Sequence, residues 1–169
     1  MKSFSFTVEH YTLRTLLLDE NFENYYSWIK DPAKFNFIES AKTNYQLSEL
    51  ISFVNLCNES SNIILLGIFD SLKDLHVGNI KFEIINNTKI AYFGILIGED
   101  SYRGIGLAQL VMRKSFIWIK KCLEINKIIL GVNRSNQQAI KAYKKFGFLE
   151  TDNLDEKSIK MEYLIGPTK

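Results

Sequence analysis

Three apolar runs rich in β-branched residues follow one another in the middle of the chain, with only short polar breaks between them. They span residues 63–69, 76–85 and 89–97, and the polar turn 86–88 separates the last two. Runs of this length with such side chains predict strands, and breaks this short join antiparallel strands. The centre of the fold is therefore expected to be an antiparallel meander.

Helical and strand patterns continue on both sides of this meander. Apolar residues at helical spacing predict helices over 19–28, 47–56, 106–122 and 136–146. Shorter apolar runs predict further strands over 11–18, 128–132 and 158–165. Gly147 follows the last helix, where a glycine commonly ends one. This order predicts a mixed α/β (α+β) protein built around one sheet.

Length and composition exclude several classes of protein. With 169 residues, the chain is expected to form a single domain over 1–169. A content of 46% apolar and 24% charged residues is typical of a globular protein, and the net charge of +2, with Lys and Arg dispersed, does not favour nucleic-acid binding. The N-terminus lacks a signal-peptide pattern, and no run approaches the roughly 18 apolar residues of a membrane span. A cytoplasmic protein without membrane contact is expected.

Cysteine and histidine offer no obvious chemistry. Cys57 and Cys122 form no CxxC pair and have no neighbouring histidine, so no metal site is expected. His10 and His76 are isolated in the sequence, and no catalytic role is expected for either.

A loop with two glycines joins the last strand of the meander to the helix over 106–122. Free N–H groups and the dipole at a helix N-terminus favour an anion, and small residues let a phosphate approach the backbone. The loop is no dinucleotide fingerprint, because Gln109 stands where Gly or Ala is required, and it lacks the Lys-Ser/Thr pair of a Walker loop. The alternatives are a phosphate loop of another kind and a plain strand-to-helix turn.

Two segments resemble the signatures of GNAT acetyltransferases. The pattern Arg103-x-x-Gly106-x-Ala108 matches the family's pyrophosphate motif, Q/R-x-x-G-x-G/A, and follows a strand as in that family. The stretch NRSNQQAIKAYKKFGF is similar to the second signature, whose recurring residues correspond here to Asn136, Ala139, Ile140, Tyr143, Gly147 and Phe148. The resemblance extends over nearly the whole chain. It implies the GNAT fold, a central, mostly antiparallel mixed sheet of six to seven strands flanked by helices, and an acetyl-CoA-dependent N-acetyltransferase whose amine acceptor attacks directly.

The resemblance also implies where acetyl-CoA binds. The pyrophosphate is expected on the loop formed by Arg103, Gly104, Ile105, Gly106, Leu107 and Ala108. The pantetheine arm is expected to pair with backbone groups around Ile95, Leu96 and Ile97. Gly94 and Gly98 in the same region predict a bulge or a close backbone approach.

Asn136 and Tyr143 are the side chains to which the resemblance assigns roles. Asn136 is expected to contact the cofactor, and Tyr143 to donate a proton to the CoA thiolate as it leaves. Seven residues separate them, two helical turns, so they share one face of a helix. Asn136 is also a sound helix N-cap, which is compatible with that role. The alternative for Tyr143 is a core aromatic, since it shares an apolar stripe with Ala139 and Phe146.

Direct attack requires a neutral amine, so an ammonium acceptor must first lose a proton. Protein N-terminal alanine acetyltransferases of this superfamily place a Glu five residues before the motif Asn, and this chain has Gly131 there. Glu39 is the first candidate base, because its region borders the acceptor site in the family, and Glu83 is the second. The alternative for each is an ordinary surface carboxylate.

The segment YYSWIKDPAKFNFIES resembles the beginning of small bacterial GNAT proteins of the RimJ/RimL type, some of which acetylate nucleotide-linked amino sugars. An amino sugar, free or linked to a nucleotide, ranks first as acceptor, before a protein N-terminus and a small amino acid or polyamine. The 19 Asp and Glu are dispersed, which disfavours a polyamine. A CoA-binding module without catalysis is the remaining alternative, and either a monomer or a homodimer is expected.

Overall fold

The structure, a computed structural model, describes residues 3–31 and 45–167. Its strands are β1 (Ser5–Val8), β2 (Tyr11–Thr15), β3 (Ile63–Asp70), β4 (Leu75–Ile84), β5 (Ile90–Ile97), β6 (Lys127–Asn133), β7 (Leu149–Asn153) and β8 (Ser158–Leu164). Its helices are α1 (Glu23–Lys30), α3 (Leu47–Glu59), α4 (Leu107–Leu123), α5 (Gln137–Phe146) and the short 3-10 helix η1 (Asp100–Tyr102). Every expected element is present, although the first expected strand ends three residues early, at Thr15.

The strands form one mixed sheet in the order β1-β2-β3-β4-β5-β6-β8-β7, and only the pair β5 and β6 is parallel. The described chain thus has eight strands, more than the expected six to seven. The two strands that sequence analysis missed lie at the edges of the sheet. All five residues of β7 are exposed, so no apolar alternation marks it, and β1 is only four residues long.

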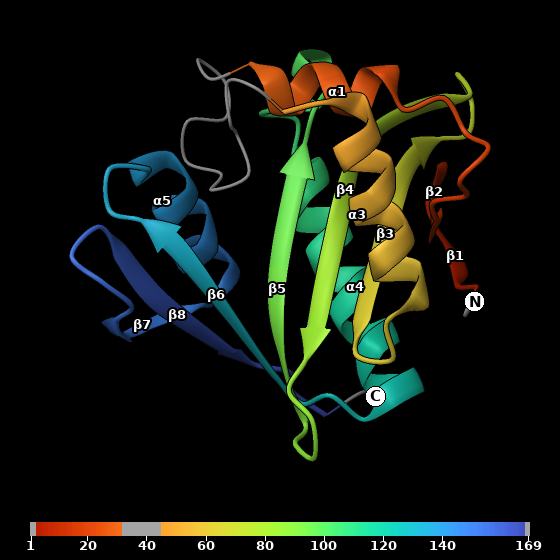
Figure 1. Ribbon diagram of the computed structural model, residues 1–169. Coiled ribbons are helices and arrows are strands. Elements are labelled where there is room, and N and C mark those ends of the chain that lie inside the picture. Colours follow the sequence, from red (N-terminus) through yellow and green to blue (C-terminus); the bar gives the residue numbers. More distant parts are fainter. Residues whose placement is uncertain (1–2, 32–44, 168–169) are drawn as a thin grey trace.

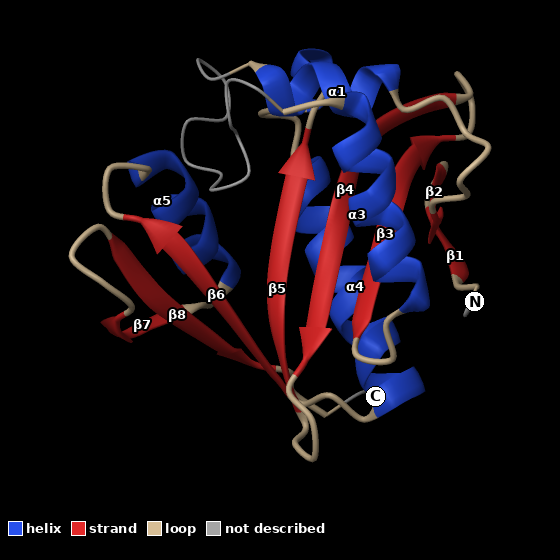
Figure 2. Ribbon diagram, in the orientation of Figure 1, coloured by secondary structure: helices blue, strands red, loops and turns tan. Residues whose placement is uncertain are grey.

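Helices cover both faces of this sheet and bury two separate apolar clusters (Figure 2). On one face, α4 packs its buried residues, among them Val111 and Phe116, against the central strands. On the other face, α1 and α3 contribute Trp28, Leu50 and Val54 to the second cluster. Among the helices of the described residues, none is long and apolar enough to cross a membrane.

The sheet splits between its two parallel strands. β5 and β6 are paired over three positions only, Ile90 with Lys127, Ala91 with Ile128 and Tyr92 with Ile129. Beyond these pairs the strands diverge, and α5 lies beside the far end of β6 (Figure 1). The facing backbone edges of both strands are therefore without a strand partner over the rest of their length.

Gly94, within β5, and Gly98, directly after it, differ in their surroundings. β4 and β5 stay in register from Gly78–Ile97 to Ile84–Ala91 without a shift, so no bulge is present at Gly94. Gly98 does show the expected close approach, because a Cβ atom there would lie 1.9 Å from the Trp28 indole.

Candidate acetyl-transfer site

The loop that leaves β5 is shaped by two glycines. Gly104 and Gly106 adopt left-handed backbone conformations, with φ of 73° and 89°. Residues with a Cβ atom rarely occupy this region, and glycine does so without steric penalty. No atom lies within 4 Å of the place where a Cβ would stand at either position. The loop therefore bends into α4 and leaves open space beside its backbone.

The N-terminus of α4 offers a row of unused hydrogen-bond donors. The backbone N–H groups from Gly104 to Gln109 donate to no group of residues 3–31 and 45–167, and the first bond of the helix runs from the Leu110 N–H to the Gly106 carbonyl. Unpaired N–H groups and the positive end of the helix dipole attract an anion. Together with the open space at the two glycines, this arrangement fits a pyrophosphate group.

Two side chains hold this loop against the sheet. Arg103 turns back and donates from Nε to the Ile97 carbonyl at 2.9 Å, and its guanidinium also lies 3.5 Å from Asp100. The Tyr102 hydroxyl donates to Asp70 Oδ2 at 2.7 Å, and this hydrogen bond lowers the pKa of the Asp70 carboxyl. Arg103 thus fixes the path of the loop from the end of β5.

The second signature segment lies against the first. Asn136 caps α5, since its Oδ1 accepts from the Ala139 N–H at 3.1 Å, and the N-cap interpretation is confirmed. Gln109 Nε2 donates to the Ala142 carbonyl at 3.0 Å. This bond ties the first turn of α4 to the turn of α5 that carries Tyr143.

Tyr143 combines features of both interpretations that the sequence left open. Its half-buried ring packs on the Phe148 ring, with centroids 5.5 Å apart. Its hydroxyl makes no hydrogen bond to another described residue. Burial raises the pKa of Tyr143 to about 12, so the hydroxyl keeps its proton at neutral pH. The residue is a packed aromatic with an unused donor.

Backbone groups of β5 alternate between β4 and the gap. The Gly98 N–H donates to the Val77 carbonyl. Because hydrogen-bonded pairs alternate along an antiparallel ladder, Leu96, opposite Asn79, is the next residue of β5 whose backbone bonds β4. The backbone groups of Ile95 and Ile97 consequently face the gap toward β6, where the Ile97 carbonyl is taken by Arg103. Of the three predicted pantetheine contacts, Ile95 offers both backbone groups, whereas Leu96 offers only its side chain.

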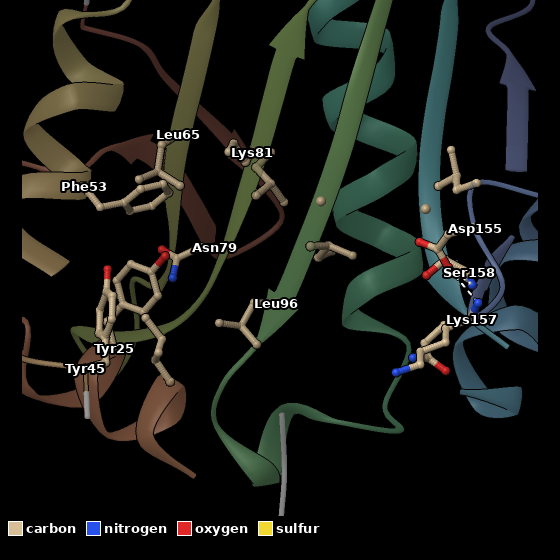
Figure 3. A pocket seen from close by; sticks show the side chains of 17 residues that line it. Tyr25, Tyr45, Phe53, Leu65, Asn79, Lys81, Leu96, Asp155, Lys157 and Ser158 are labelled. Carbon is tan, nitrogen blue, oxygen red and sulfur yellow. Dashed lines mark hydrogen bonds between the residues drawn. The ribbon is translucent and has the colours of Figure 1, made fainter. Parts of the chain in front are cut away.

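A cavity of about 760 Å³ lies on the α1 and α3 side of the split, a volume typical of small-molecule sites. One wall carries Tyr25, Tyr45, Phe53, Leu65 and Asn79, and the opposite wall carries Asp155, Lys157 and Ser158 (Figure 3). Leu96 of β5 lies between these walls. The cavity therefore adjoins the strand expected to hold the pantetheine arm.

The charged side chains of the described lining are Lys81, Asp155 and Lys157. Asp155 Oδ1 accepts from the backbone N–H groups of Lys157 and Ser158, both at 2.7 Å, so this carboxylate is engaged in its own turn. Lys81 Nζ lies 3.6 Å from Glu83, a long and partly exposed pair. The described lining thus holds two positive charges and one negative charge, and Glu83, just outside the lining, offsets part of the charge of Lys81.

The position where some relatives carry a base is an exposed glycine bordered by one leucine. A Cβ atom on Gly131 would lie 2.6 Å from Leu154 Cδ1, the end of a half-exposed side chain from the turn between β7 and β8. A larger residue at this position requires Leu154 to change its rotamer.

The two candidate bases have different outcomes. Glu83 lies on β4 beside the cavity but outside its lining, and it pairs with Lys81. Glu39 lies outside the described residues. Neither role is tested by the geometry.

A strand-to-helix loop with free N–H donors at the open end of a split sheet, beside a small-molecule cavity, is the arrangement expected of a CoA-dependent acyltransferase. The family model of the acetyltransferase (GNAT) domain matches residues 10–149, and the chain belongs to this family. It is therefore an acetyl-CoA-dependent N-acetyltransferase. A search of curated proteins finds no match.

Solved structures share the fold at low sequence identity. RimL, a ribosomal L7/L12 α-N-protein acetyltransferase in complex with coenzyme A, has a TM-score of 0.81 and 13% identity, over 96% of this chain and 98% of that one. Spermidine N-acetyltransferase from Vibrio cholerae, in complex with CoA and spermine, has a TM-score of 0.76 and 20% identity, over 92% of this chain and 96% of that one. Ribosomal-protein-S5-alanine acetyltransferase from Vibrio fischeri has a TM-score of 0.72 and 14% identity, over 95% of this chain and 96% of that one. The expected RimJ/RimL type is thus confirmed at the level of the fold.

Sequence reasoning missed the side chains of the cavity. Asn79 and Lys81 alternate with apolar residues in a run expected to form a strand, and two polar residues in such a run are a usable signal. Lys157 and Asp155 carried no comparable signal, because they lie in a polar turn between strands, one of which was not expected.

Proposed function

We propose that the enzyme transfers acetyl from acetyl-CoA to the primary amine of a small acceptor that also carries an anionic group, a nucleotide-linked amino sugar ranking first. The observation that carries this proposal is the positive charge of the cavity. Lys81 and Lys157 line it, and the only carboxylate of the described lining, Asp155, is bonded within its own turn. Phosphate oxygens are suitable partners for both lysines.

The same charge disfavours a polyamine. A polyamine carries several ammonium groups, and like charges at short range raise its binding free energy. The positive charge of the lining also helps an amine to react, because nearby cations lower the pKa of an ammonium group and favour the neutral form that attacks. A strong carboxylate base is then less necessary than in a negatively charged site.

Acetyl-CoA supplies the activated acetyl thioester. Its pyrophosphate would be held by the N–H groups from Gly104 to Gln109 and its pantetheine arm by the backbone of Ile95. Tyr143 supplies a donor for the sulfur. With a pKa of about 12, well above the roughly 8.5 of an ordinary thiol, Tyr143 stabilises the leaving thiolate by a hydrogen bond more readily than by giving up its proton.

A protein N-terminus is the second candidate acceptor. The similarity in fold to the RimL and ribosomal-protein-S5 enzymes supports it. A CoA-binding module without catalysis is the third, and the unused donor on Tyr143 speaks against it.

The test combines binding and turnover. Saturating acetyl-CoA at a hundredfold excess over its dissociation constant should stabilise the fold by about 2.7 kcal/mol in a thermal melt. Release of free CoA is then measured with four amines: glucosamine 6-phosphate, an amine that carries no anionic group, a peptide with a free N-terminus, and spermidine. A preference for spermidine would overturn the anionic acceptor, and a melting shift without any CoA release would support the non-catalytic module.

A further inference from the structure

Two buried polar side chains lie together on β4, Asn79 in the cavity lining and His76 in contact with it outside the lining. His76 and Asn79 are 9% and 3% exposed, and neither belongs to the two signature segments. His76 Nε2 lies 3.0 Å from the Gly78 carbonyl oxygen and 2.9 Å from Asn79 Oδ1. Burial lowers the pKa of His76, so the ring is neutral at physiological pH.

This geometry determines the orientation of the Asn79 amide. A backbone carbonyl only accepts hydrogen bonds, so His76 Nε2 must carry its proton to bond Gly78. The same N–H then requires an acceptor on Asn79, which places Oδ1 toward the histidine and Nδ2 away from it. Reversing the amide would set two donors against each other.

Asn79 Nδ2 is consequently a donor without a partner. It is buried, it has no hydrogen bond in the described structure, and Asn79 lines the cavity. A buried donor left unpaired destabilises a protein, and each such group calls for an explanation. A ligand in the cavity that accepts its N–H bonds provides one.

The pair is held rigidly. The His76 ring stacks on Phe69 with centroids 4.6 Å apart and meets the Trp28 ring edgewise at 5.1 Å. Trp28 is itself fixed, because its Nε1 donates to Glu99 Oε1 at 3.0 Å. His76 cannot rotate away without disturbing these contacts, so Asn79 is presented in one orientation.

The strand that carries Asn79 indicates which substrate it meets. Asn79 pairs in register with Leu96, and its side chain lies on the cavity face, in the same lining as the Leu96 side chain. The pantetheine arm is expected at the backbone edge of β5 that faces β6, which is the edge turned away from β4. Asn79 lies on β4 and points into the cavity, so we place it on the acceptor side.

We propose that Asn79 is a specificity residue whose Nδ2 donates to an oxygen on the carbon skeleton of the acceptor, a hydroxyl, ring or carbonyl oxygen near the amine, and that His76 is the positioning residue that orients it. This proposal rests on the proposed function. It narrows the acceptor to oxygenated amines, since a hydrocarbon amine would leave Nδ2 unpaired. Sites built around such a donor discriminate strongly against analogues that lack the oxygen.

The test compares glucosamine with cyclohexylamine, two amines on six-membered rings that differ in oxygen. In the wild-type enzyme kcat/KM should favour glucosamine. Asn79→Leu keeps the side-chain size and should lower that ratio at least about tenfold, with the loss on glucosamine and the KM for acetyl-CoA unchanged. An unchanged ratio in Asn79→Leu overturns the proposal.

Two histidine variants separate positioning from folding. His76→Gln retains an N–H for Asn79 Oδ1 and should keep most of the preference, whereas His76→Phe retains the ring stacking and should lose it. Equal ratios in both variants would overturn the positioning role.

A spectroscopic measurement is independent of turnover and of variant folding. Glucosamine added to the wild-type protein with CoA, which has no acetyl group to transfer, should shift the ¹⁵N–H signals of the Asn79 side-chain amide, and cyclohexylamine should not. An absent shift with glucosamine overturns the inference, whereas absent CoA release with every amine counts against the proposed function instead.

Discussion

At the proposed cofactor end of the cleft the donors are consecutive backbone N–H groups, whereas at the acceptor end the polar groups are side chains on α1, β4 and the turn between β7 and β8. The first set follows from one short segment, Gly104 to Gln109, and from the helix that begins there. The second exists only when the sheet brings distant strands together. A backbone site tolerates many sequences around its glycines, and a side-chain site changes with each residue.

The strongest way to sharpen this comparison is Tyr143→Phe, which removes one donor from the cofactor end. We expect kcat to fall roughly 10²–10³-fold, the usual loss for a donor to a developing negative charge, with acetyl-CoA binding intact. Because the pKa of Tyr143 is raised to about 12, the wild-type rate should show no falling limb from this group below about pH 11.

The matched control is Tyr163→Phe, because Tyr163 belongs to the same aromatic cluster, 5.3 Å from the Phe148 ring. A lower melting temperature with full turnover in Tyr143→Phe would support the core-aromatic alternative.

At the acceptor end, Glu39→Gln should lower turnover by about 10²-fold if this carboxylate accepts the proton of the amine, while leaving the dissociation constant of acetyl-CoA unchanged. Glu59→Gln is the control, since Glu59 lies at the exposed end of α3 and accepts from Asn55 Nδ2, and we expect less than a twofold effect. Wild-type rates for Glu39→Gln across the pH range would leave Glu83 or solvent to accept the proton.

Ala108→Asp tests whether the cofactor end depends on the charge of the helix terminus. An acidic residue in the first turn stabilises a helix but repels pyrophosphate, so acetyl-CoA should bind at least about tenfold more weakly without loss of folding stability. Ser48→Asp makes the same change at the second position of α3 and should leave binding unaffected. Equal binding in both variants, measured by calorimetry, would place the pyrophosphate elsewhere.

The smallest effect is expected for Lys81→Gln. The substitution should raise the KM for glucosamine 6-phosphate about three- to tenfold and leave the KM for glucosamine unchanged. Because salt screens the interaction between charges, the KM for glucosamine 6-phosphate should differ less between variant and wild type at high salt. Lys89→Gln is the control, because Lys89 forms a comparable exposed ion pair with Glu124. Equal changes for both sugars would mean that Lys81 does not contact the phosphate.

The same contrast explains how far the sequence could predict the molecule. The meander, the helices and the loop 103–108 were predictable, because local periodicity and glycine position determine them. The split after Tyr92 was not, since it depends on how few pairs β5 and β6 make. Nor was the contact between His76 and Asn79, because His76 is isolated in the sequence and meets Asn79 through strand geometry. The exposed strand β7 left no apolar pattern to find.

The contact between Gly131 and Leu154 has a consequence for how such a chain can diverge. A Gly131→Glu exchange would place a carboxylate where related enzymes have one, and its Cβ would stand 2.6 Å from Leu154 Cδ1. This atom is the far end of a flexible side chain that is 47% exposed, so a change of the Leu154 rotamer relieves the contact at small cost. A single substitution at an exposed strand position therefore separates this chain from relatives with a glutamate base. Divergence between the two kinds of site is a short evolutionary step.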